Sequence, residues 1–285
     1  MFFQVLLNGL FVGSVYCLIS LGLTLILGVM DIADFAQGAM IMLGAFLAFF
    51  GLKVWGFNYV FVFICASLAV TVVGIINNII VYQPAMRRGA NTLIVALGVL
   101  LIIQNLALLI FGPDYHALTF PFGSQNIYIA GATISIYKGT IILIALALVI
   151  FVALFLQRTK IGKAIRAISQ DKEGAAIVGI DGSKVSVMTF GIGTFLIGLT
   201  GALLSPVYAF DVHFGLDLIT KAFIIVIFGG LGSIRGAILG ALIIGIGENM
   251  IAGYISTEYS SLVTFLLLIA ILFSRPQGVF GEKSI

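Results

Sequence analysis

Long apolar runs, separated by short polar breaks, extend along nearly the whole chain. An α-helix needs about 20 apolar residues to cross the hydrocarbon core of a bilayer. Five runs approach or exceed this length, and they cover residues 4–30, 59–82, 92–111, 139–156 and 185–208. Four shorter runs, which glycine interrupts, cover residues 36–52, 216–231, 236–252 and 262–273. The pattern predicts an all-α membrane protein, a polytopic bundle of about 8–9 segments in which the short ones are tilted, broken or re-entrant.

The amino-acid composition supports the assignment to helical membrane proteins. Of the 285 residues, 61% are hydrophobic and 9% are charged, whereas about 25% of the residues in soluble domains are charged. The apolar runs are continuous rather than alternating, which excludes a transmembrane β-barrel. Cys17 and Cys65 both lie inside apolar runs, and their spacing predicts no disulfide framework, metal site or bound cofactor. The first run is longer than a signal peptide and has no basic segment before it, so it is interpreted as the first membrane helix. Residues 1–285 are expected to form a single membrane domain.

Basic residues gather in two of the polar breaks. Arg87 and Arg88 share one of them, and residues 158–184 hold six of the 14 Lys and Arg residues. Because Lys and Arg accumulate on the cytoplasmic side of membrane proteins, both breaks are expected to face the cytoplasm. The break between them, residues 112–138, then faces outside, and its alternating stretch IYIAGATISIY predicts a small β-hairpin. Nine crossings place the N-terminus outside and the C-terminus inside.

The basic loop of residues 158–184, RTKIGKAIRAISQDKEGAAIVGIDGSK, carries the signals of a short folded helix. Candidate capping residues flank that helix and precede the next membrane segment: Ser169 or Asp171, Gly179, and Asp181 or Ser183. Glu173 lies in the expected first turn, where the helix dipole favours an acid. Residues 175–178 are apolar, and a helix with apolar residues in the cytoplasm either docks on a protein partner or lies flat on anionic lipid.

Charged and amide side chains interrupt several apolar runs, where they are costly and usually paired or functional. Lys221 can pair with Glu248, or with Asp217 one helical turn earlier. Such a pair either fixes the register of the helices or contacts a substrate. Amides form a second group, which either hydrogen-bonds between helices or lines a pathway; it comprises Asn77, Asn78, Gln104 and Asn105.

Two glycine-rich segments, about residues 28–44 and 229–240, are candidate walls of a translocation pathway. The first contains the polar stretch DIADFAQG, in which Asp34 and Gln37 either line the pathway or lie in a solvated inner loop. The second begins with GGLGSIRG, whose first two residues are Gly229 and Gly230. So dense a run of glycine breaks a helix and predicts a turn or an unwound hinge.

Segments in several parts of the chain resemble one family. The loop segment RTKIGKAIRAISQDKEGAAIVGID resembles the part of ABC-transporter permeases that docks onto ATPase subunits, and most resembles the H-type permeases of branched-chain amino acid importers. Before it, GLTLILGVMDIADFAQGAMIMLGA is similar to the family's glycine-rich entry segment. After it, TKAFIIVIFGGLGSIRGAILGALIIGIGE and STEYSSLVTFLLLIAILFSRPQGVFG are similar to its second glycine-rich segment and its C-terminal end. The chain departs from the family pattern Asn-Phe-Ala-His-Gly at Asp34 and Gln37.

The resemblance implies an inner-membrane transport subunit with several partners. A permease of this family pairs with a related M-type permease, two ATP-binding subunits bind from the cytoplasm, and a periplasmic or surface binding protein delivers the substrate. The chain is expected to be no enzyme, because it has no G-x-x-x-x-G-K-[ST] phosphate loop, and to bind no nucleic acid. Residues 175–179 would form the coupling helix. The residues implied in contact with the ATPase are Arg166, Asp171, Lys172, Glu173, Ala175, Ala176 and Gly179.

Two other functions stay open at this point. The departures at Asp34 and Gln37 also fit an importer of urea, a short amide or another small polar solute. The second alternative is a self-sufficient secondary transporter or channel. The folded basic loop argues against it, as does the lack of a chain of intramembrane acids or histidines that would carry protons.

Overall fold

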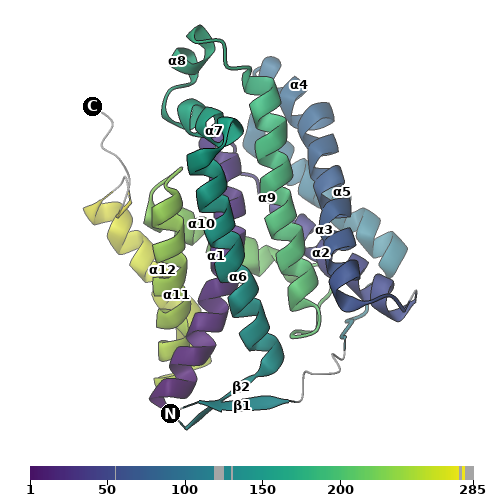
Figure 1. The fold of residues 1–285 in the computed structure, drawn as a ribbon, viewed down its shortest axis with the longest axis vertical. Helices are drawn as coiled ribbons and strands as arrows, with labels where there is room; N and C mark the ends of the chain where they lie inside the picture. Colours follow the sequence, from purple (N-terminus) through teal and green to yellow (C-terminus); the bar gives the residue numbers. More distant parts are fainter. Residues whose placement is uncertain (55, 119–124, 130, 276–277, 280–285) are drawn as a thin grey trace. The chain divides into compact units, whose positions relative to one another are not determined.

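Helices make up most of the described chain, which comprises residues 1–54, 56–118, 125–129, 131–275 and 278–279 of the computed structural model (Figure 1). Eight helical spans in it are long and apolar enough to cross a membrane: α1 (Phe2–Met30), α2 (Ala36–Lys53), the span Tyr59–Arg87, α5 (Thr92–Phe111), α6 (Ile136–Arg158), α9 (Gly182–Leu204), α11 (Ile234–Tyr254) and α12 (Thr257–Ser274). A further helix, α10 (Phe214–Gly229), has 16 residues. The predicted all-α bundle of about 8–9 segments is confirmed.

The span Tyr59–Arg87 is assembled from three pieces. These are α3 (Tyr59–Asn77), the π-helical turn η1 (Asn78–Tyr82) and α4 (Gln83–Arg87). π-helical turns inside α-helices are rare and occur frequently at functional sites. This one contains the buried residues Asn78 and Tyr82.

The loop between α5 and α6 contains the predicted hairpin. Strands β1 (Asn126–Ile129) and β2 (Ala132–Ser135) pair in antiparallel fashion. Gly131 lies between them with a φ of 80°, a conformation that favours glycine. Gln4 of α1 holds the hairpin, because its amide donates to the carbonyl of Thr133 (2.7 Å) and accepts from the Thr133 N–H (2.8 Å).

The chain forms two compact units. Unit 1 comprises residues 1–24, 119–151 and 221–285, and unit 2 comprises residues 25–118 and 152–220. The helices α1, α6 and α10 contribute residues to both units.

In unit 1, glycine lets the first half of α1 pack closely on α11. A Cβ on Gly245 would lie 2.4 Å from the Cα of Gly13, and a Cβ on Gly9 would lie 2.8 Å from the Cα of Ile246. Small residues permit such close approach in lipid, where no hydrophobic effect drives helices together. Helix α12 packs against α11 as well.

In unit 2, helices α2, α3 and α9 pack against one another. A Cβ on Gly44 of α2 would lie 2.1 Å from the carbonyl oxygen of Gly198 in α9. A Cβ on Gly74 of α3 would lie 2.4 Å from the side chain of Thr194, also in α9. Helix α9 is therefore fixed between two neighbours at backbone distance.

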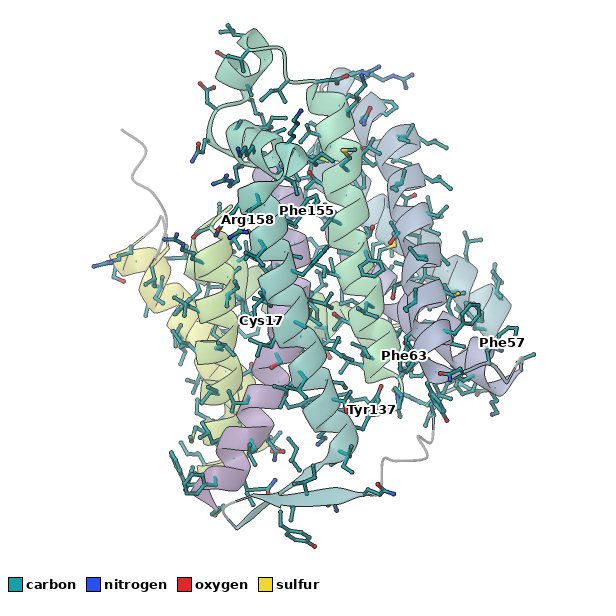
Figure 2. All side chains as sticks on the ribbon, viewed as in Figure 1. Cys17, Phe57, Phe63, Tyr137, Phe155 and Arg158 are labelled. Carbon is teal, nitrogen blue, oxygen red and sulfur yellow. The ribbon has the colours of Figure 1, made fainter. Side chains whose placement is uncertain are left out.

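The spans differ in how far the rest of the chain covers them. Among the most apolar 18 residues of each span, 83% are buried in α1 and 72% in α9, but only 22% in α6 and 11% in α12. Figure 2 shows the side chains along α6, from Tyr137 near its start to Phe155 and Arg158 near its end. Such large apolar faces must meet lipid or another subunit.

Candidate functional site

Two short helices, α7 (Lys160–Gln170) and α8 (Lys172–Ile177), form the basic loop between α6 and α9 (Figure 1). Asp171 caps α8, since its carboxylate accepts a hydrogen bond from the N–H of Gly174 at 3.0 Å. Gly179 follows the helix with a φ of 83°, the left-handed conformation in which glycine commonly ends helices. The predicted cap and stop of this helix are confirmed.

The loop then leads directly into the next membrane helix. Asp181 caps α9 by accepting hydrogen bonds from the backbone N–H groups of Ser183 and Lys184. The bond from Lys184 is the main reason why the pKa of the Asp181 carboxyl lies below its ordinary value. Ser169, the other candidate cap for α8, instead donates its hydroxyl to the carbonyl of Arg166.

Helix α8 begins at Lys172 and not at Ala175, so the expected coupling helix of residues 175–179 is wrong in its bounds. The reason is that the capping carboxylate directly precedes Lys172 and fixes the first turn there. Ala175 is buried, but Ala176 is exposed, and the side chains after it are strongly so: Ile177 is 85% exposed and Val178 is 75% exposed. The loop thus presents a rigid apolar tip.

Charged side chains surround this tip. Arg166, Asp171 and Glu173 are exposed, whereas Lys172 forms an ion pair with Asp31 in the turn between α1 and α2. Both partners are well exposed, so the pair contributes at most about 1 kcal/mol to stability. Its consequence is structural, because it joins α8 to the turn at the end of α1.

That turn buries a carboxylate. Asp34 is 0% exposed and accepts hydrogen bonds from the hydroxyl of Tyr82 (2.5 Å), the amide of Gln37 (2.7 Å) and the N–H of Ala36 (3.0 Å). Burial raises the pKa of the Asp34 carboxyl, and the three donors oppose that rise. Gln37 is also 0% exposed, so these two side chains are not solvated, whereas Asp31 at the start of the same stretch is.

One atom of this network is unsatisfied. Within the described chain, Oε1 of Gln37 has no hydrogen-bond partner. A buried acceptor without a donor costs about 1–3 kcal/mol. An N–H or O–H group from a passing solute or from another chain would remove that cost.

Two of the intramembrane amides bond in different ways, and the buried Nδ2 of Asn77 has no hydrogen-bond partner within the described chain. Asn78 of η1 donates to the hydroxyl of Ser186 in α9 at 3.0 Å, and so bonds between helices as expected. Asn105 donates to the carbonyl of Leu101 within its own helix, and its side chain is exposed on α5. The sequence gives little sign of Tyr82, because an aromatic residue at the end of an apolar run resembles an interface anchor.

A charged cluster lies inside unit 1. The ammonium of Lys221 in α10 lies 3.0 Å from Glu248 in α11, and not beside Asp217, which is exposed. Glu248 is 6% exposed and also accepts from Tyr16 of α1 (2.8 Å) and Thr264 of α12 (3.0 Å). Four helices therefore converge on one carboxylate. Within the described chain, no three His, Cys, Asp or Glu side chains group to hold a metal ion.

The second glycine-rich break forms a tight turn. Helix α10 ends at Gly229, and Gly230 and Gly232 follow with φ values of 98° and 78°. A Cβ on Gly236 in α11 would lie 2.0 Å from the carbonyl oxygen of Gly229. The predicted turn is confirmed, and its glycines bring two helix ends into backbone contact.

These features define a multi-pass helical membrane protein with a folded basic loop and buried polar clusters, and its relatives place it in the cytoplasmic (inner) membrane. Residues 5–272 match the family described as the permease component of the branched-chain amino acid transport system. The chain belongs to that family.

Its relatives include two kinds of permease. The chain is 30% identical over 300 residues to the high-affinity branched-chain amino acid transport system permease protein LivH of Escherichia coli K12, covering 100% of this chain and 97% of the relative. It is 32% identical over 304 residues to BraD of Pseudomonas aeruginosa, with the same coverage. It is also 23% identical over 298 residues to LivM of Salmonella typhimurium, covering 93% of this chain and 67% of the relative. No solved structure gives a significant match.

Proposed function

We propose that the chain is the permease subunit of an ATP-driven importer for branched-chain or related amino acids. It forms the translocation path with a second permease of the LivM kind. Two ATP-binding subunits drive it from the cytoplasm, and an external binding protein delivers the substrate. The observation that carries the proposal is the exposed apolar tip of Ile177 and Val178 on the capped helix α8. Such a tip docks on a protein partner or lies on lipid, and we favour the protein partner because the chain belongs to a family of transport-system permeases.

Helix α8 is built to transmit movement into the membrane part of unit 2. Ala175 anchors it by burial, and Lys172 ties it to Asp31 in the turn after α1. That turn contains the buried network of Asp34 and Gln37. A shift of α8 on ATP binding would therefore reach this network through a short series of contacts.

Polar groups at several positions would bind the charged groups of the solute as it crosses the membrane. A zwitterion leaving water needs partners for both of its charges, and each unit buries groups able to supply them: Lys221 and Glu248 in unit 1, and Asp34 and Gln37 in unit 2. Gly229 and Gly230 have no side chain that could obstruct a path, although Leu231 beside them is 65% exposed. The amide of Asn105 lies on the outer face of α5 and would join the path only where a second permease covers that face.

Uptake by the reconstituted complex tests the proposal. The variant Ile177→Ser should lose most ATP-driven uptake of leucine and co-purify with less ATPase. Burial of an isoleucine contributes about 1.5–3 kcal/mol, so docking should weaken roughly ten-fold or more. Ile255→Ser is the matched control, because Ile255 is 71% exposed in the turn between α11 and α12, which is expected to face outside.

Unchanged uptake by Ile177→Ser would contradict a docking role for α8. Parallel vesicles would receive labelled urea and a short amide in place of leucine. Transport of these solutes without leucine would leave the ATP-driven mechanism in place and reassign the substrate.

A further inference from the structure

A cavity of about 270 Å³ opens in unit 2 beside α8. Five helices line it: the end of α1, α4, α7, α8 and the start of α9. The lining residues that matter below are Val29, Met86, Arg87, Ile168 and Lys172. The two loops expected in the cytoplasm meet here, so the cavity lies at the cytoplasmic boundary of the membrane.

The charges of the cavity favour an anion. Arg87 has no ion pair within the described chain, and the partner of Lys172, Asp31, is 76% exposed. The hydroxyl of Ser183 and the amide of Gln83 also line the cavity but bond to each other at 2.6 Å. No Asp or Glu is among the lining residues, and the one carboxylate beside them, Asp31, is already paired with Lys172, so Arg87 leaves the cavity with an excess of positive charge.

The remaining wall of the cavity is apolar and continues onto the membrane face of the chain. Val29, Met86 and Ile168 supply apolar surface beside the two cations. Met86 is 39% exposed at the cavity, and along the same span Ile76 and Ile80 are 47% and 67% exposed. An apolar surface thus leads from the bilayer to the positive charges. A small soluble anion would leave this apolar surface uncovered, whereas the acyl chain of a lipid would pack against it.

We propose that this cavity binds the head group of an anionic phospholipid from the cytoplasmic leaflet. The phosphate lies between Arg87 and Lys172, and the acyl chains follow the exposed residues of α3 and η1. The planar guanidinium of arginine matches two phosphate oxygens, and lysine adds a point charge. Basic pockets between membrane helices on the cytoplasmic side hold such head groups. The bound lipid would brace α8 against α4, whatever solute the protein carries.

Native mass spectrometry of the full chain in a mild detergent tests this site. The wild-type protein should retain one molecule of added phosphatidylglycerol and release phosphatidylcholine readily. Arg87→Gln should weaken phosphatidylglycerol binding about five-fold, since a basic residue near an anionic surface contributes about 1 kcal/mol. Arg88→Gln is the matched control, because Arg88 is the exposed next residue and does not line the cavity.

Three results would overturn the assignment. The first is equal lipid binding by the wild type and by Arg87→Gln with unchanged helical circular dichroism. The second is equal weakening by Arg88→Gln, which would reveal diffuse attraction to a basic surface. The third is displacement of phosphatidylglycerol by free 4-methyl-2-oxopentanoate that depends on Arg87, which would assign the cavity to a soluble carboxylate.

Discussion

Glu248 illustrates the conditions under which a membrane helix can retain a carboxylate. Removing a charge from water costs several kcal/mol, and a single opposite charge seldom repays it. Glu248 has the ammonium of Lys221 and two hydroxyl donors, Tyr16 and Thr264. Each partner comes from a different helix, so the cluster also fixes how four helices meet. Sequence separation explains why the donor Tyr16 was hard to foresee, since it lies 232 positions from Glu248.

Removing the ammonium group of Lys221 should show how far the stability of this cluster depends on the ion pair. We expect Lys221→Met to lower the free energy of unfolding by on the order of 3 kcal/mol, because it leaves a buried carboxylate without a counter-charge. The double variant Lys221→Met/Glu248→Gln should regain part of the loss. Denaturation of the purified chain, followed by circular dichroism, measures both effects.

Asp217→Asn is the control for the two Lys221 variants. Asp217 lies one turn before Lys221 but is exposed, so its neutralisation should leave stability close to that of the wild type. If Lys221→Met is as stable as Asp217→Asn, the ion pair is not what stabilises this cluster.

At the scale of the element, features that depend on neighbouring residues could be predicted from the sequence. Features that depend on contacts between residues far apart in the chain could not. Within the described chain, apolar runs located the eight spans of membrane length and the shorter α10. The Asp171 and Gly179 signals located α8, because caps depend on neighbouring residues. The π-helical turn of η1 has no such local signal. It directs Tyr82 onto Asp34, a partner 48 positions away, and so the buried state of Asp34 could not be foreseen.

Close helix packing gives a prediction at this scale. Gly44→Ala should destabilise the protein by about 1–3 kcal/mol, since the new Cβ would lie 2.1 Å from the carbonyl oxygen of Gly198. Gly98→Ala is the matched control: Gly98 lies in the membrane helix α5, and a Cβ there would meet no atom of the described chain within 4 Å. Thermal unfolding of both variants in the same detergent provides the comparison.

The control should be neutral or slightly stabilising, because alanine favours helices more than glycine does. An equal effect of the two substitutions would mean that α2 and α9 do not depend on glycine for their contact.

For the whole molecule, the basic loops predict the orientation. Arg87 and Lys172 come from loops far apart in the sequence, yet both line one cavity of unit 2. They therefore lie on the same side of the membrane, which the accumulation of Lys and Arg predicts to be the cytoplasmic side. In unit 1, Gln4 near the N-terminus holds the hairpin. The N-terminus and the hairpin are therefore expected on the same side as each other, and the predicted nine crossings place that side outside.

Cysteine labelling in cells tests this orientation directly. Single substitutions Gln170→Cys, at the end of α7, and Gln125→Cys, before β1, place thiols at two exposed positions. They would be made in a Cys65→Ser background, since Cys65 is exposed whereas Cys17 is buried. A membrane-impermeant maleimide should label Gln125→Cys in intact cells and Gln170→Cys only after permeabilisation, because a bilayer separates the two sites. Labelling of Gln170→Cys in intact cells would reverse the orientation and remove α8 from the reach of any cytoplasmic ATPase.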